Sequence, residues 1–136
     1  MARKLFSQIL TEVQEAADED KSIVLQQNDN VMVRQLLLAT FDPTVVFDVP
    51  IPEFRENTET DGYSANNLYV EYKRLYIFMD SYKKIPLVRK SVLLAQILES
   101  IDVSDAPWLI QVIKKDLSAT GLTKEIVNEA FPGLIK

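Results

Sequence analysis

The side chains whose types and spacing suggest a chemistry are the basic and tyrosine residues of the stretch 72–90, and that chemistry is anion binding. Within residues 73–90, six basic residues face one acidic residue, Asp80. Cations interleaved with aromatic rings are typical of surfaces that bind nucleic acids. Cations also suit the C-terminal end of a helix, and tyrosines at helical spacing often pack half-buried, so both interpretations remain open. The residues proposed for binding are Lys83, Lys84, Arg89 and Lys90, with Tyr72, Tyr76 and Tyr82 nearby.

A second group of candidate residues surrounds a glycine turn near the C-terminus. Lys114 and Lys115 end one predicted helix, and Gly121, Thr123 and Lys124 lie at the start of the next. A helix N-terminus offers unpaired backbone N–H groups and partial positive charge, so this turn could hold a phosphate. The structural alternative is that Gly121 ends one helix while Thr123 caps the other. Spacing by itself favours the structural interpretation, because such turns are common in helical proteins.

Few side chains in this sequence are suited to catalysis. The chain has no Cys and no His, which excludes thiolate nucleophiles, imidazole bases and the commonest zinc ligands. Acidic pairs such as Glu12 with Glu15 and Glu125 with Glu129 fall on the outward faces of predicted helices, which favours solvated surface over a metal site. We therefore expect no enzyme activity, no cofactor and no metal.

Composition and charge fit one compact domain spanning residues 1–136. Of the 136 residues, 47% are hydrophobic and 26% are charged, which is enough to bury one core. The sequence has neither an apolar run of membrane-spanning length nor a signal-peptide core, so we expect a cytoplasmic location. A net charge of −5 argues against nucleic-acid binding by bulk attraction. The charge is uneven, because residues 1–70 carry five basic and twelve acidic residues whereas residues 71–136 carry ten and eight.

Apolar residues recur at three- and four-residue steps through most of the chain, which predicts an all-α bundle of six to seven helices. The helix after Pro86 is apolar over most of its circumference, so we expect it to be central to the core. The expected helices are one over 2–17, one capped by Asp20 and ending at Gln27, one capped by Asn30, one capped by Ser64, one starting at Pro86, one capped by Ser104 and one capped by Thr123.

A long proline-containing connection over 42–62 interrupts the helical pattern. Its three prolines lack backbone donors and push the preceding residues toward extended conformations. Its apolar first part should pack on the core, whereas residues 55–61 should be solvated and mobile. A short hairpin at 45–51 is a further possibility. The apolar residues are Val45, Val46, Phe47, Val49, Ile51 and Phe54.

Residues 115–135 contain a basic residue followed by Asp-Leu, a Gly-bearing turn, a helix with apolar spacing, and Phe-Pro-Gly-Leu-Ile. This order resembles the end of the N-terminal DNA-binding domain of ATP-dependent DNA ligases, most strongly those of T-even bacteriophages. Upstream, Asn28-Asp-Asn30 and the Phe41-to-Pro52 connection appear in similar order. The chain is also similar to small uncharacterised proteins of T-even-like phages, marked by Ala39-Thr-Phe-Asp-Pro43 and Ala130-Phe-Pro-Gly-Leu134.

The resemblance implies an all-helical domain that grips duplex DNA through its minor groove and phosphates, and a phage protein working in the host-cell cytoplasm. The positions that match the ligase pattern are Lys114, Lys115, Gly121, Thr123 and Lys124.

The chain departs from the ligase pattern in two ways that shape the expected function. Its first half is acidic, and its nearest string to the ligase nucleophile motif, 59–62, begins with Glu59 instead of Lys. We therefore predict a non-catalytic module that binds DNA or a DNA-processing complex through its C-terminal half. The alternative is a protein-interaction or inhibitor module that keeps the fold without binding DNA. Such a module would contact a host or phage DNA-processing protein through its acidic half, whose Asp18–Asp20 cluster and 53–61 arm could imitate DNA phosphates, or through the 42–62 segment.

Overall fold

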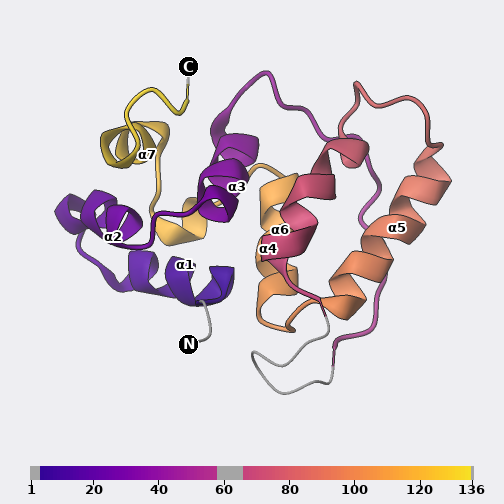
Figure 1. The fold of residues 1–136 in the computed structure, drawn as a ribbon, viewed down its shortest axis with the longest axis horizontal. Coiled ribbons are helices and arrows are strands. Elements are labelled where there is room, and N and C mark those ends of the chain that lie inside the picture. Colours follow the sequence, from indigo (N-terminus) through magenta and orange to yellow (C-terminus); the bar gives the residue numbers. More distant parts are fainter. Residues whose placement is uncertain (1–3, 58–65, 136) are drawn as a thin grey trace.

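The computed structural model describes residues 4–57 and 66–135, and within these ranges the regular structure is helical (Figure 1). Its seven α-helices confirm the predicted all-α class and the bundle of six to seven helices. None of the described helices is long and apolar enough to cross a membrane. The α-helices are α1 (Phe6–Glu15), α2 (Lys21–Gln27), α3 (Val31–Phe41), α4 (Leu68–Glu71), α5 (Leu87–Ser100), α6 (Asp105–Ile113) and α7 (Lys124–Ala130), and the 3₁₀ segments are η1 (Asp18–Asp20), η2 (Tyr72–Phe78) and η3 (Ser118–Thr120).

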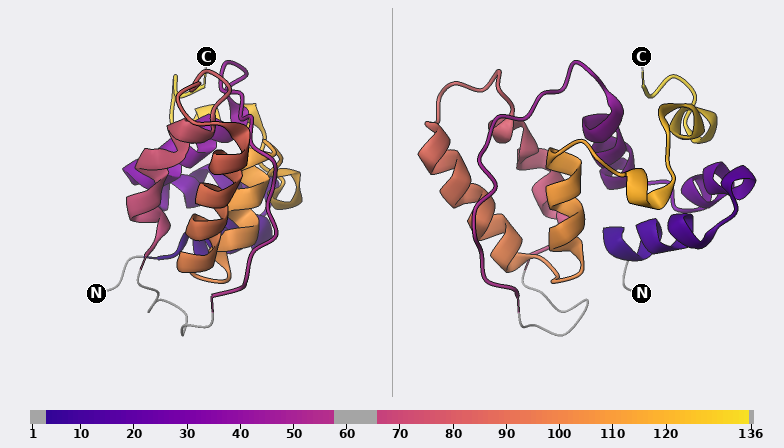
Figure 2. Two further views of the ribbon diagram at one scale, coloured as in Figure 1. Left: turned by 90° about the vertical axis from the view of Figure 1, so that its right-hand side faces the viewer. Right: turned by 180° about the vertical axis from the view of Figure 1, so that it is seen from behind.

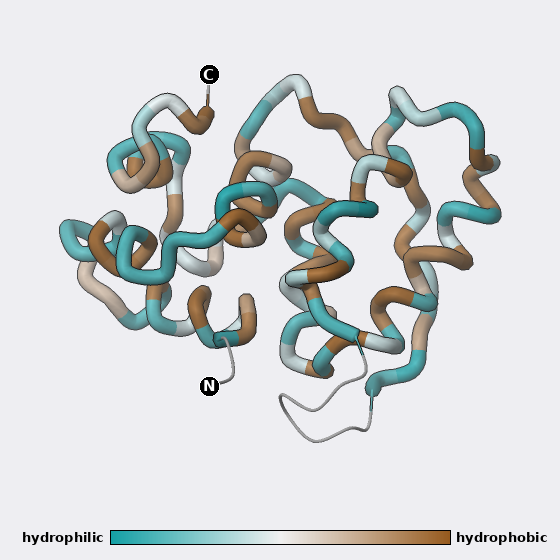
Figure 3. Tube along the Cα trace, in the orientation of Figure 1, coloured by the Kyte–Doolittle hydropathy of each residue, from teal (hydrophilic) through white to brown (hydrophobic). Residues whose placement is uncertain are grey.

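One hydrophobic core connects these helices. Every α-helix contributes buried apolar side chains to the same cluster, whose largest members include Phe6, Phe78 and Phe131. Hydrophobic residues recur along the whole trace instead of forming one block (Figure 3). The molecule is elongated, with α2 and α7 at one end of its long axis and α5 at the other (Figure 1). Both ends therefore depend on the same core for their stability.

Helix α5 lies at the edge of the molecule, so the prediction that it is central to the core is wrong (Figure 2). Its inner face buries Leu94, Ile97 and Leu98. Its outer face leaves Val88 79% exposed and Val92 42% exposed. Apolar residues lie around most of this helix, but those at Val88 and Val92 are not covered by another element.

Three helix starts follow the sequence prediction. The Asn30 side chain accepts a hydrogen bond from the backbone N–H of Val33 at 2.9 Å and caps α3. The Thr123 side chain does the same for α7 by accepting from the N–H of Ile126 at 3.2 Å. Pro86 immediately precedes α5, where its fixed φ suits a helix start.

Other predicted helix ends differ from the structure. Helix α1 begins at Phe6 and ends at Glu15, inside the predicted span 2–17. Asp20 and Ser104 occupy N-cap positions, but neither side chain makes the capping bond. Ser104 is instead a hydrogen-bond donor: its backbone N–H and its hydroxyl both donate to Asp102 Oδ1, at 3.0 and 2.7 Å. Ser64 lies outside the described residues.

The connection after α3 is extended and anchored at both ends. No hairpin forms at 45–51, because the local partner is η2: the Asp48 N–H donates to the Phe78 carbonyl at 2.8 Å, and the Asp80 N–H donates to the Val46 carbonyl at 2.9 Å. The connection then runs alongside α5 (Figure 2), where the Ser91 hydroxyl donates to the Pro50 carbonyl at 3.2 Å. The predicted packing of its first part is confirmed for Val45, Phe47, Val49 and Phe54, which are partly buried against the core. It is wrong for Val46 and Ile51, which are exposed.

The second part of the connection is better anchored than the sequence predicts. The Arg55 backbone N–H donates to Glu99 Oε2 at 2.8 Å. The Asn57 side-chain amide donates to the carbonyls of Ser100 and Ile101 at 3.1 and 2.8 Å. Arg55 and Glu56 are exposed, as the prediction of a solvated segment requires. The expectation of a mobile segment is not met at Arg55 and Asn57, because these two residues bind the C-terminal end of α5. Residues 58–61 and the 59–62 string lie outside the described residues.

Candidate nucleic-acid interface

Lys115 is turned inward and closes the end of α3. It follows α6 with a positive φ of 58°, which only a minority of non-glycine residues adopt. Its Nζ donates to the carbonyls of Ala39 and Asp42 at 2.8 and 2.7 Å. Burial lowers the pKa of this lysine, although the nearby Asp42 carboxylate opposes that effect. The ammonium group therefore serves a helix terminus, and its side chain does not project from the surface as a phosphate contact would require.

Lys90 is also directed into the protein. Its residue is 2% exposed, and its Nζ donates to the Met79 carbonyl at 2.9 Å. Met79 is the residue that ends η2. Lys90 therefore ties the first turn of α5 to the end of η2, and it is not available to an external anion.

The predicted phosphate turn is a junction between helices. Gly121 has a left-handed φ of 77°, and a Cβ placed there would lie 3.0 Å from Cε of Lys21. Lys21 is itself buried, and its Nζ donates to the carbonyls of Val13 and Ala16 at 2.7 and 2.9 Å at the end of α1. Thr123 uses its side-chain oxygen to cap α7. The local geometry of Gly121 and Thr123 is that of the structural alternative.

Two cations of the C-terminal group remain on the surface. Lys114 and Lys124 are exposed, but each has carboxylates close along the chain. Hydrogen bonds from Ser118 lower the pKa of the Asp116 carboxyl, and the charge of Lys114 adds to this effect. Glu125 directly follows Lys124. This mixed charge gives the C-terminal group a weak attraction for an anion.

The basic residues around Pro86 form a more uniform surface. Exposed cations lie on η2, on the loop 79–86 and in the first turn of α5. The Tyr76 ring, 53% exposed, meets the Tyr82 ring edge-to-face, with centroids 5.4 Å apart and planes 79° apart. Lys73 lies 5.9 Å from the centroid of the Tyr72 ring. We call this the Tyr76 surface, and it consists of Lys73, Tyr76, Tyr82, Lys83, Lys84 and Arg89.

The cations of the Tyr76 surface make no ion pair within the described part of the chain. Ion pairs in the described part of the chain join Lys4 to Glu12, Arg34 to Asp29 and Arg74 to Glu71, and none involves a residue of this surface. Asp80 is the one acidic residue in the stretch 73–90. A local excess of unpaired positive charge attracts anions even when the whole molecule is acidic.

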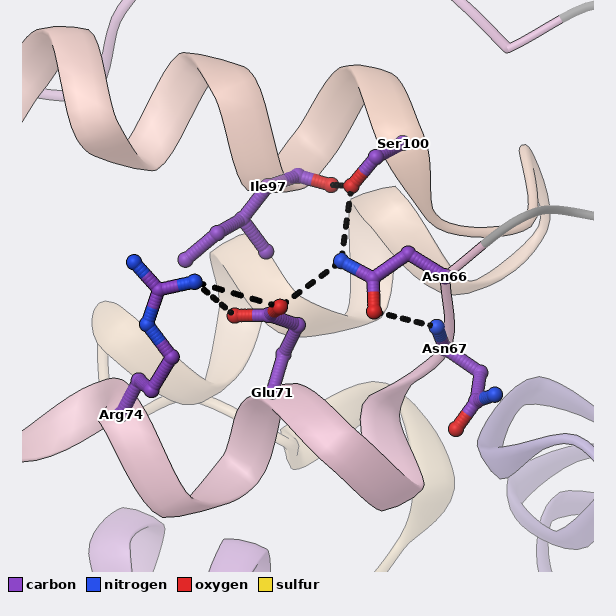
Figure 4. A network of polar contacts seen from close by, with 6 residues as sticks. All are labelled: Asn66, Asn67, Glu71, Arg74, Ile97 and Ser100. Carbon is purple, nitrogen blue, oxygen red and sulfur yellow. Dashed lines mark hydrogen bonds and ion pairs between the residues drawn. The ribbon is translucent and has the colours of Figure 1, made fainter.

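A polar network anchors the start of η2 to the C-terminal end of α5 (Figure 4). Glu71 is 4% exposed and precedes η2. Its carboxylate accepts hydrogen bonds from the Asn66 amide at 2.8 Å and from Arg74 at 3.3 and 3.4 Å. Asn66 also donates to the Ser100 hydroxyl at 3.0 Å, which joins the start of α4 to the end of α5. Together with Lys90, this network fixes η2 against both ends of α5.

An apolar groove of about 320 Å³ adjoins the Tyr76 surface. Its walls come from α3 and η2, and residues at its edge include Val31, 59% exposed, and Tyr76. Sequence reasoning missed this groove because its two walls are separated by the connection after α3, and no local pattern indicates that they meet. The other lining residues are Gln35, Leu36, Leu38, Ala39, Val45, Tyr72, Lys73, Leu75 and Met79.

The structure does not bring the two predicted groups together. Lys124 lies on α7 at one end of the long axis, whereas the loop and helix start that carry Lys83, Lys84 and Arg89 lie at the opposite end (Figure 1). Within the described residues, no group of three His, Cys, Asp or Glu side chains is arranged to hold a metal ion.

The fold and this surface define a small all-α protein with a locally cationic, tyrosine-bearing face. Residues 9–119 match the model of a family of unknown function, DUF6433, so the chain belongs to that family. No curated protein matches the chain. The matched segment contains the whole Tyr76 surface together with Lys114 and Lys115, while Gly121, Thr123 and Lys124 lie beyond it.

Proposed function

We propose that this protein is a non-catalytic DNA-binding module, similar to the N-terminal domain of phage DNA ligases, that contacts phosphates through the Tyr76 surface. The observation that carries the proposal is that the exposed cations Lys73, Lys83, Lys84 and Arg89 make no ion pair within the described residues, while the exposed Tyr76 lines a groove with Lys73 and contacts Tyr82, next to Lys83. Phosphate contacts supply most non-specific binding to DNA, and aromatic rings add contacts to bases. The resemblance to ligases supplies the expectation that the ligand is DNA.

We place the proposed contacts on the Tyr76 surface and not on the C-terminal turn. Lys115 and Lys90 hold backbone carbonyls, and Gly121 and Thr123 shape a helix junction. Lys114 and Lys124 remain secondary candidates, because they are exposed but lie beside carboxylates. A DNA complex centred on Lys83, Lys84 and Arg89 places the acidic residues around α1 and η1 away from the phosphates, because those elements lie toward the other end of the molecule.

A salt-titrated binding assay with matched charge reversals tests this proposal. The first variant, Lys83→Glu/Lys84→Glu/Arg89→Glu, should lose binding to a fluorescein-labelled duplex. It should also reduce the slope of log K against log salt by about three, because each lost phosphate contact contributes about 0.9. The control, Arg55→Glu/Lys114→Glu/Lys124→Glu, has the same net charge and should retain most of the affinity. If only the control lost binding, the proposal would be contradicted, and Lys114 and Lys124 near the C-terminal turn would become the favoured phosphate contacts.

A protein-interaction or inhibitor module is the second candidate, and the outer face of α5 favours it. Val88 is 79% exposed there, with Leu87 and Val92 at 45% and 42%. Apolar side chains gathered on one exposed helix face are typical of a protein contact, here with a host or phage DNA-processing protein. If the native chain fails to bind DNA at low salt, Val88→Asp/Val92→Asp should abolish co-purification with that partner from infected cells. Retention of the partner by this variant would contradict the α5 contact.

A further inference from the structure

We infer that the Tyr76 surface and the apolar groove beside it form a site for single-stranded nucleic acid, with an unstacked base in the groove and the adjoining phosphates on Lys73, Lys83 and Lys84. This inference rests on the proposed function, because it specifies which form of nucleic acid that surface selects. The groove and the tyrosine provide the selectivity, and the lysines provide the attraction.

The groove has the size and lining that a base requires. Its volume of about 320 Å³ lies at the lower end of the range of about 300–1,000 Å³ for pockets that hold small molecules. Leu36, Ala39, Val45 and Leu75 give it an apolar lining, and Gln35 supplies an amide able to hydrogen-bond a base edge. A flat, partly apolar ring with polar edges is the kind of ligand that such a lining accepts.

Tyr76 connects the groove to the cations. Its ring lines the groove and is 53% exposed, while the edge-to-face contact with Tyr82 restrains its orientation. Tyr82 is followed directly by Lys83 and Lys84, and Lys73 lies on the groove itself. Proteins that bind single strands combine a cationic path for the backbone with aromatic rings on which bases stack. The same two components adjoin each other here.

The arrangement suits a single strand better than a duplex. Bases in a duplex are stacked on one another and do not offer their faces to a protein side chain, whereas unpaired bases do. A duplex-wide grip would also need cations spread over an extended face, but Lys90 and Lys115 point inward and Lys124 lies at the other end of the molecule. Among the remaining cations, Lys73 lines the groove, and Lys83 and Lys84 directly follow Tyr82, whose ring contacts Tyr76.

The groove is formed before any ligand arrives. One wall is fixed because the Asp48 and Asp80 backbone N–H groups bond across the 46–48 and 78–80 segments, and because Lys90 holds the Met79 carbonyl. The other wall is the first three turns of α3, whose core face is buried. A preorganised site loses less conformational freedom on binding, so a few contacts are enough for measurable affinity.

Fluorescence anisotropy at low salt, with a labelled oligothymidine and a blunt duplex of the same length, tests the inference. The native chain should bind the oligothymidine about ten-fold more tightly than the duplex. Tyr76→Ala should weaken oligothymidine binding by about ten-fold, the effect expected from losing one stacked base, and should weaken duplex binding much less, because paired bases do not offer their faces to the ring. Tyr76→Phe is the matched control, and it should bind like the native chain because stacking needs the ring and not the hydroxyl.

A second probe reports the base directly. A 2-aminopurine placed within the oligothymidine should lose fluorescence on binding to the native chain and keep it on binding to Tyr76→Ala, since stacking quenches that base. Circular dichroism of each variant checks that the fold is retained, as expected for a half-exposed side chain.

The outcomes separate the two proposals. Equal binding of both probes, lost on charge reversal at Lys83, Lys84 and Arg89 but unaffected by Tyr76→Ala, would overturn the single-strand site and leave the proposed DNA-binding function standing. Absence of binding to either probe at low salt would overturn both.

Discussion

Three buried or half-buried lysines, Lys21, Lys90 and Lys115, place their ammonium groups on the backbone carbonyls that end a helix. Lys21 serves α1, Lys90 serves η2 and Lys115 serves α3. The last carbonyls of a helix have no hydrogen-bond partner within the helix, and they carry partial negative charge. A lysine ammonium group therefore supplies both the missing hydrogen-bond donor and an opposite charge. In each case the lysine comes from another element, so the bond also fixes how two elements are placed.

The neighbours Lys114 and Lys115 should respond differently to the same substitution. Lys115→Met leaves the carbonyls of Ala39 and Asp42 without their ammonium donor, so we expect the free energy of unfolding to fall by about 1–3 kcal/mol. Lys114→Met changes an exposed side chain and should alter it by less than about 0.5 kcal/mol. Urea unfolding measures both values. Equal effects of the two substitutions would show that the Lys115 bonds contribute nothing to stability.

Asp105 should make the stability depend on pH in a defined direction. The residue is 1% exposed, and its Oδ1 accepts a hydrogen bond from the Ser7 backbone N–H at 2.8 Å. Burial raises the pKa of this carboxyl, with a smaller upward contribution from the Asp102 charge, while bonds from Ser7 oppose the shift. The folded state therefore holds this proton more tightly than the unfolded chain does. The resulting stabilisation is complete below the unfolded pKa, about 3.9, and is lost as pH rises through the raised folded value.

The matched pair Asp105→Asn and Asp105→Ala checks this direction. Asn keeps an acceptor for Ser7 without a charge, so the native chain should lose stability relative to Asp105→Asn as the pH rises from acid toward neutral. Asp105→Ala leaves the Ser7 N–H unpaired and should cost about 1–3 kcal/mol at acid pH. Urea unfolding followed by the fluorescence of Trp108, the one tryptophan, gives these values. A stability difference between native and Asn forms that does not vary with pH would contradict the assignment.

At the scale of elements, the packing of α1, α2 and η3 gives Gly121 a neighbour that Gly133 lacks, so the two glycines should differ in the cost of adding a side chain. Gly121 and Gly133 both have a positive φ, 77° and 79°, but a Cβ at Gly121 would meet Lys21, whereas a Cβ at Gly133 would meet nothing within 4 Å. Gly133→Ala should cost about 1–2 kcal/mol from backbone strain alone. Gly121→Ala should cost more, because it also displaces the lysine that closes α1.

A double-mutant cycle with Lys21→Ala isolates the contact between Gly121 and Lys21. With the lysine shortened, the extra cost of Gly121→Ala over Gly133→Ala should disappear, and thermal or urea unfolding of the four variants measures the coupling. Identical costs for the two glycine substitutions in the native background would show that the Lys21 side chain moves aside freely.

Local elements were predictable from sequence where their cause was local. The caps at Asn30 and Thr123 depend on a bond to a residue three positions later, and Pro86 acts through its own φ. At Ser104 the same pattern failed because its hydroxyl donates to Asp102 and pairs with the Ser7 hydroxyl. A serine with a nearby tertiary partner gives the same sequence signal as a capping serine.

The candidate site was predictable only in part, for the same reason. Exposed cations at Lys83, Lys84 and Arg89 lie where the charge pattern placed them. Lys90 and Lys115 point inward because each binds backbone carbonyls that lie 11 to 76 residues away in the sequence. No local sequence pattern contains that information. The edge position of α5 was equally hidden, because its apolar circumference does not indicate which side meets a neighbour.

At the scale of the whole molecule, the segment after residue 119 is part of the core although it lies beyond the family match. Val127, Phe131 and Ile135 are each no more than 3% exposed, and α7 packs on α2. The guanidinium of Arg34, on α3, lies 4.6 Å from the centroid of the Phe131 ring. Because one buried cluster includes side chains from these helices and from α5 at the other end, we expect the two ends of the molecule to unfold together.

Removal of residues 121–136 should therefore destabilise the whole protein. In the native chain, urea unfolding followed by Trp108 fluorescence, from α6, and by far-UV circular dichroism should give coincident transitions, as expected for one cooperative unit. A chain ending at Thr120 should lose cooperative unfolding, because it lacks the buried Val127, Phe131 and Ile135 and leaves the α7-facing side of α2 open to water. Phe131→Ala should cost about 3–5 kcal/mol, whereas Ile23→Ala, on a 49% exposed residue of α2, should cost much less. Two separate transitions in the native chain, or an unchanged midpoint after the truncation, would mean that α2 and α7 form a unit independent of the rest of the core.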